Sequence, residues 1–109
     1  MSQDTDRIRS LNDDLRKDLF GGHAIITTGI AELGPEAFLR LAKTIAVFDD
    51  FHHANDPHSE HDFGMFNFDG RDIIFKIDYY DKSLSYHSPD PGDPAVTERV
   101  ITIMLSSEY

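Results

Sequence analysis

Two runs of alternating residues joined by Asp69-Gly70 constrain the fold more than any other feature of this sequence. The runs span Phe63 to Phe68 and Arg71 to Tyr80. Asp-Gly favours a two-residue type I′ turn, because both central residues of that turn need positive φ. A two-residue turn makes its flanking strands antiparallel. Apolar and polar positions alternate in the second run, which predicts a sheet with one buried face. That face would carry Ile73, Phe75, Ile77 and Tyr79.

Residue spacing predicts three elements before this hairpin. Asp4 to Phe20 carries apolar residues at three- and four-residue steps, which indicates an amphipathic helix that ends at Gly21-Gly22. His23 to Thr28 is short and rich in β-branched residues, so we expect a strand. A second helix begins at Pro35, a residue favoured at the first helical position, and ends near Phe48 or Phe51.

Two further elements are predicted after the hairpin. Leu84 to His87 can form a short strand. Asp93-Pro94 resembles the start of a helix, with Asp93 as N-cap. Apolar residues follow that start at helical spacing, namely Val96, Val100, Ile103 and Met104.

The predicted order αβαβββα indicates an α+β fold. We expect a two-layer arrangement of three helices on an antiparallel or mixed sheet of about four strands. The 109 residues fit a single domain, residues 1–109.

The charge balance restricts the classes of partner. The chain has 20 acidic and 10 basic residues and a formal net charge of −10. Nucleic acids and anionic lipids bind through Lys and Arg, so we expect no direct nucleic-acid or membrane binding. A basic protein surface or a cation is the natural complement. The absence of cysteine excludes disulfides and thiolate metal sites. No signal peptide is evident at the N-terminus, which favours a cytoplasmic protein.

A histidine-rich, base-free stretch is the first candidate site. No Lys or Arg occurs from Thr44 to Gly70. Within it, His58 and His61 are candidate ligands for a divalent metal, and Glu60 and His61 are candidate acid–base groups. Their spacing matches no strong metal signature, and the alternative is that they bond loop backbone or face solvent. His52-His53, just upstream, could clip a metal ion, but adjacent side chains on a helix or strand seldom point the same way, which argues against it.

The second candidate site lies on the longer strand of the hairpin. Lys76, Asp78 and Tyr80 share one face at two-residue spacing, and Asp81 follows them. This is a candidate binding surface, with Asp78 and Tyr80 as candidate catalytic groups; the alternative is an ordinary solvent-facing strand. If the loop from Asp49 to Asp62 folds over this face, the histidines and Glu60 would converge with Asp78.

The sequence resembles a known bacterial family over nearly its whole length. The resemblance is carried by Phe48-Asp49-Asp50-Phe51, Asn55 to Gly64, Lys76 to Asp81 and Ser88-Pro89-Asp90-Pro91. These motifs resemble the family named Domain of Unknown Function 3768. The resemblance implies a small proteobacterial protein, often from a plasmid or another mobile element, with no known activity or cofactor. The family pattern tends to have Gly where this chain has Ser59.

Three functional hypotheses follow. The leading one is a non-enzymatic binding or accessory protein that engages a basic partner, such as a nucleic-acid-binding protein that it blocks by mimicking DNA phosphates. Its candidate binding residues are Asp56, His58, Glu60, Asp62, Lys76, Asp78, Tyr80 and Asp81. The alternative is a small metal-dependent or acid–base enzyme that uses the His58-Glu60-His61 loop. The third is a homo-oligomer formed through an uncovered sheet edge. The leading hypothesis needs no cofactor; the enzyme hypothesis would use a divalent metal.

Overall fold

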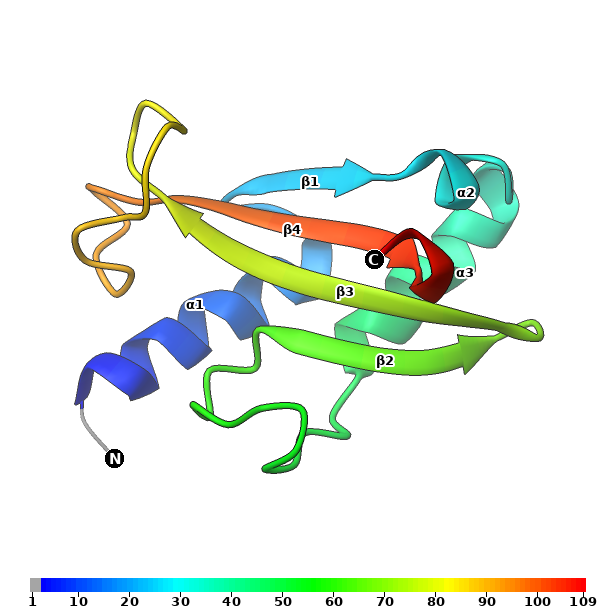
Figure 1. Ribbon diagram of the computed structural model, residues 1–109, viewed down its shortest axis with the longest axis horizontal. Coiled ribbons are helices and arrows are strands. Elements are labelled where there is room, and N and C mark those ends of the chain that lie inside the picture. Colours follow the sequence, from blue (N-terminus) through cyan, green and yellow to red (C-terminus); the bar gives the residue numbers. More distant parts are fainter. Residues whose placement is uncertain (1–2) are drawn as a thin grey trace.

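A four-stranded mixed sheet carries two long helices on one face (Figure 1). The computed structural model describes residues 3–109. Its helices are α1 (Gln3–Asp18), α2 (Thr28–Ala31) and α3 (Pro35–Val47), and a 3-10 turn, η1, spans Ser106–Glu108. Its strands are β1 (His23–Ile26), β2 (Phe63–Phe68), β3 (Arg71–Tyr80) and β4 (Glu98–Leu105). The α+β class and the two-layer arrangement are confirmed.

The sheet has the order β1-β4-β3-β2. β2 pairs antiparallel with β3, and Asp69 and Gly70 have φ of 52° and 83°, as the predicted turn requires. β4 pairs antiparallel with β3 and parallel with β1, so the sheet is mixed. β1 and β2 are therefore the two edge strands.

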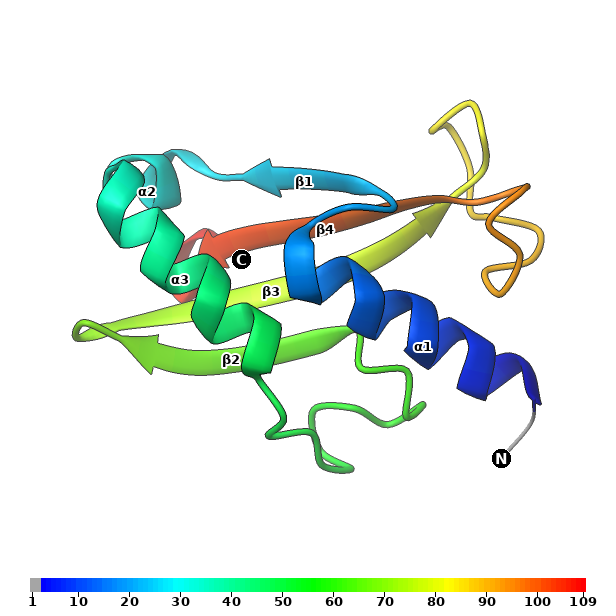
Figure 2. The ribbon, with the colours of Figure 1, turned by 180° about the vertical axis from the view of Figure 1, so that it is seen from behind.

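The core lies between the sheet and the layer formed by α1 and α3 (Figure 2). Because side chains alternate along a strand, one face of β3 and β4 points into this layer and the other points away from it. The completely buried residues include Leu41, Ile45, Ile73, Phe75, Ile101 and Ile103. We call the opposite side, which α1 and α3 do not cover and over whose edge η1 lies in Figure 1, the open face of the sheet.

The predicted C-terminal helix is wrong, because residues 98–105 form the strand β4. Val100-Ile101-Thr102-Ile103 is a β-branched run that favours a strand. β4 is central, so it is buried on both faces and lacks the simple alternation that marks a half-exposed strand. Asp93 does accept the amide of Ala95 on its carboxylate, as an N-cap would, but only a single turn follows, because β4 begins at Glu98.

Two smaller predictions also need correction. The strand predicted over Leu84 to His87 is reduced to one isolated bridge between Tyr80 and His87. The strand predicted to end at Thr28 ends at Ile26, because the short helix α2 begins at Thr28. In the described part of the chain, no helix combines the length and the apolar character needed to cross a membrane.

Candidate functional site

The histidine loop, which we define as residues 49–62, packs against α1. Three α1 side chains spaced three and four residues apart on one helix face donate hydrogen bonds to backbone carbonyls of the loop and of the residue before it. The pairs are Arg9 to Ser59, Asn12 to Glu60 and Arg16 to Phe48, each at 2.9 Å. The loop therefore lies on the helix side of the sheet.

Glu60 belongs to a buried hydrogen-bond network. Its carboxylate accepts the hydroxyl of Tyr79 at 2.8 Å. The amide of Asn12 donates to that same hydroxyl at 2.8 Å and accepts from Arg99 at 2.7 Å. Burial raises the pKa of Tyr79 and lowers the pKa of Arg99, because a buried site disfavours the charged form. Glu60 thus joins the loop to α1, β3 and β4.

His61 lies between two carboxylates. Its Nδ1 is 2.8 Å from an Asp13 oxygen, and its Nε2 is 3.9 Å from an Asp56 oxygen. The ring stacks on Phe51 at a centroid distance of 3.9 Å. Arg16 also bonds Asp13, at 2.5 Å. An imidazole held at one nitrogen by a carboxylate can exchange a proton at the other, so this is the acid–base geometry of the loop.

A shallow pocket of about 340 Å³ opens beside His61. Ser59 and His61 line it, and both have positive φ, 58° and 56°, which is uncommon for residues other than glycine. The remaining lining residues are Arg9, Phe51, His52, His53 and Asp56. Among residues 3–109, no group of three or more His, Cys, Asp or Glu is arranged to hold a metal ion. His58 is exposed and does not line this pocket.

Lys76, Asp78 and Tyr80 lie together on the open face, as predicted. They line a groove of about 620 Å³ with Ile25 and Val100 among its walls. The Lys76 ammonium is 2.8 Å from Asp78, and this hydrogen bond raises the pKa of Lys76. The expected convergence with the histidine loop does not occur: Glu60 and His61 contact α1 and Tyr79 on the helix side, whereas Asp78 points to the open face.

The other predicted binding residues shape loops. Asp56 is buried, and one carboxylate oxygen accepts the amides of Glu60 at 2.9 Å and His61 at 3.1 Å. Asp81 accepts the hydroxyl of Ser83, which lowers the pKa of Asp81. Asp62 is half-buried, and its pKa is raised by that burial and by the nearby carboxylate of Glu60.

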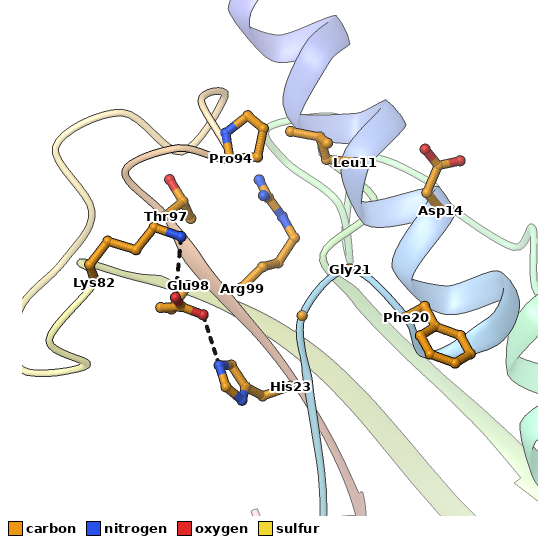
Figure 3. A pocket seen from close by; sticks show the side chains of 11 residues that line it. Leu11, Asp14, Phe20, Gly21, His23, Lys82, Pro94, Thr97, Glu98 and Arg99 are labelled. Atoms are coloured by element: carbon orange, nitrogen blue, oxygen red, sulfur yellow. Dashed lines mark hydrogen bonds and ion pairs between the residues drawn. The ribbon is translucent and has the colours of Figure 1, made fainter.

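Figure 3 shows a charged cluster that sequence reasoning missed. The Glu98 carboxylate is 2.8 Å from His23 and 3.2 Å from Lys82, and both contacts lower the pKa of Glu98. These side chains come from β4, β1 and the segment after β3, and they line a pocket of about 370 Å³. No local sequence signal links them, since β1 and β4 meet only through long-range pairing.

Most basic side chains are held by acids of the same chain. Six of them lie in ion pairs, at 2.5 to 4.0 Å. The pairs are Arg7–Asp4, Arg9–Asp6, Arg16–Asp13, Arg40–Asp69, Lys76–Asp78 and Lys82–Glu98. Arg99 is a further base that is almost fully buried. The other three bases, Lys17, Lys43 and Arg71, are exposed, and the 20 acids of the chain far outnumber them.

The sequence pattern of one protein family, described as "Protein of unknown function (DUF3768)", matches residues 26–108. The chain belongs to this family. The DUF3768 match includes the histidine loop, the hairpin and β4, and it begins at the end of β1. No curated protein and no solved structure matches the chain.

Proposed function

We propose that this DUF3768 protein is a small binding protein whose acidic surface engages a basic surface on a partner protein. The observation that carries the proposal is that most of its Lys and Arg side chains form ion pairs within the chain. With six bases in ion pairs and Arg99 buried, the net charge of −10 falls mainly on the exterior. Such a field attracts cations and repels polyanions.

The histidine loop is the surface that we assign to the partner. It contains no Lys or Arg, and Asp49 and Asp50 are exposed at its start. At its end, the raised pKa of Asp62 reflects burial and the nearby carboxylates of Glu60 and Asp56, which His58 offsets only in part. A Lys or Arg from a partner would relieve this unfavourable negative potential. The bonds from α1 hold the loop in place before binding, which reduces the entropy lost on association.

The nature of the partner follows from charge. A basic, nucleic-acid-binding protein of the cytoplasm is the partner class that a rigid acidic surface fits, and the acids would then stand in for phosphates. Binding would be steered electrostatically and weakened by salt.

The test is capture of a partner from a bacterial lysate on the immobilised chain, followed by elution with increasing salt. We expect a basic protein to be retained and to elute from the double variant Asp49→Asn, Asp50→Asn at lower salt than from the wild type. Glu32→Gln, Glu36→Gln is the matched control, because it removes two exposed acids elsewhere. Retention that does not respond to salt would contradict the proposal. Equal weakening by both double variants would show attraction to net charge alone and would reject the loop as the site.

A further inference from the structure

β1 is an exposed edge strand with an unprotected outer side. All four of its residues are exposed, with Ile25 at 51% and Ile26 at 40%. Figures 1 and 2 both show β1 at the margin of the sheet, with no other described strand beyond it. Its outward amide and carbonyl groups are therefore open to another strand.

The surroundings of β1 are unusual for this chain. From Leu19 to Ala31 there is no Asp, Glu, Lys or Arg, although charged residues make up 28% of the sequence. Phe20, just before the strand, is 78% exposed. Edge strands that remain unpaired usually carry charges, proline or a bulge that prevents association, and this segment has neither charge nor proline. Its composition is typical of an edge that is covered.

A second copy of this chain is the occupant that the charges favour. Two molecules of net charge −10 repel each other over most of their surfaces. At the segment from Leu19 to Ala31, two copies can meet without placing acid against acid; it is about twice as long as the uncharged stretch of the other edge strand, β2. A basic partner, in contrast, would gain no ion pair there.

Backbone geometry selects one register for such a contact. The amide of Thr27 bonds the carbonyl of Ile103 in β4, so the backbone groups of Ile25, two residues earlier, also point toward β4. Those of Ala24 and Ile26 then point outward. A two-fold axis at Ile25 would pair Ala24 of each copy with Ile26 of the other and would place the two Ile25 side chains opposite one another.

We propose that the chain forms a symmetric dimer in which the two β1 strands pair antiparallel about Ile25 and join the two sheets into one. All the outward backbone groups of Ala24 and Ile26 are then satisfied. The facing Ile25 side chains form a cross-strand apolar pair on the open face. This inference goes beyond the proposed function, because it concerns a neutral surface distant from the acidic loop.

Analytical ultracentrifugation of the full chain tests the dimer. We expect self-association that strengthens as salt is added, because screening weakens the repulsion between two acidic molecules while the contact segment contains no Asp, Glu, Lys or Arg. Ile25→Lys should weaken association by about tenfold or more, since two like charges would face each other at the axis. Met65→Lys is the matched control, because Met65 is 53% exposed on the other edge strand. A monomer at all concentrations, or equal weakening by both variants, would overturn the proposal.

Disulfide trapping tests the register. The chain has no cysteine, so a single introduced thiol can cross-link only to a second copy. Directly opposite residues of a non-hydrogen-bonded antiparallel pair have Cα atoms about 4.5 Å apart, which suits a disulfide. Ile25→Cys should therefore cross-link rapidly under mild oxidation, and Met65→Cys should not. Equal rates would reject pairing about Ile25.

The two proposals respond to salt in opposite directions. Added salt should weaken capture of a basic partner and strengthen the dimer. Asp49→Asn, Asp50→Asn should weaken capture but not the dimer, and Ile25→Lys should weaken the dimer, so failure of one proposal leaves the other separately tested.

Discussion

At the scale of single residues, the side chain of Asn12 connects several parts of the fold. Its side chain is completely buried and bonds three segments: the loop carbonyl of Glu60, the hydroxyl of Tyr79 and the guanidinium of Arg99. Arg99 is itself nearly inaccessible to solvent. A buried cation tolerates the loss of a hydrogen-bond partner poorly, because water cannot replace it.

We predict that Asn12→Ala destabilises the fold by about 2–4 kcal/mol, because it leaves buried polar groups on Arg99 and Tyr79 with fewer partners. Urea unfolding followed by circular dichroism gives the value. Asp14→Ala, two residues along the same helix and exposed, should change stability by only about 0.5 kcal/mol or less. Similar losses in both variants would mean that Asn12 contributes only as a helix residue.

The sequence indicated which residues have reactive side chains, but not which other side chains they bond. The sequence singled out Glu60 and His61, yet the side chains that position them are Tyr79, Asn12 and Asp13. Asn12 and Asp13 lie on the predicted helix, where they resemble ordinary polar residues. Nothing local distinguishes them, since their importance depends on a loop that lies nearly fifty residues away in the sequence.

At the scale of elements, the histidine loop shows how a backbone conformation constrains a side chain. Ser59 adopts φ of 58°, a left-handed conformation that strains residues with a side chain but not glycine. The Ser59 carbonyl accepts the bond from Arg9, so the conformation is part of the attachment to α1.

Ser59→Gly is predicted to stabilise the fold by about 0.5–1 kcal/mol, because relief of the left-handed strain exceeds the added entropy of the unfolded chain. Ser10→Gly should have the opposite sign, with a loss of about 0.5 kcal/mol, since Ser10 lies inside α1. Thermal unfolding of the two variants compares one chemical change in two backbone conformations. Destabilisation by both would argue against strain at Ser59.

Elements with local signals were predicted well. α1, α3 and the hairpin each carry a periodic pattern and a clear boundary signal, such as Pro35 at the start of α3 or Asp69-Gly70 at the turn of the hairpin. β4 was mistaken for a helix because it is buried on both faces, and an apolar run of that kind fits either period. Convergence of the histidine loop with Asp78 was conditional on the loop lying over that sheet face, and the bonds from α1 and Tyr79 place the loop on the other side.

At the scale of the whole molecule, the charge distribution determines which classes of macromolecule are attracted or repelled. The exterior is negative because ion pairs within the chain occupy most of its bases. DNA and RNA binding requires exposed cations that displace counterions from phosphates. The same charge makes two copies repel each other over most of their surfaces.

The chain is predicted not to bind nucleic acid directly. Fluorescence anisotropy of a labelled DNA duplex, titrated with the protein at low salt, should remain flat, because repulsion is strongest where screening is weakest. An anisotropy rise that disappears on adding salt would contradict the charge distribution described above. The same titration with a single-stranded RNA extends the prediction to the second class of polyanion.

β4 is the last strand to be synthesised, yet it lies between β1 and β3. While the chain is still emerging from the ribosome, β1 has no neighbour, because Val100, the partner of His23, has not yet been made. The nascent protein therefore holds an isoleucine-rich strand unpaired through most of its translation, and chaperones recognise exposed segments of this kind. Folding is consequently a late event, and a chain interrupted before Glu98 would lack the middle of its sheet.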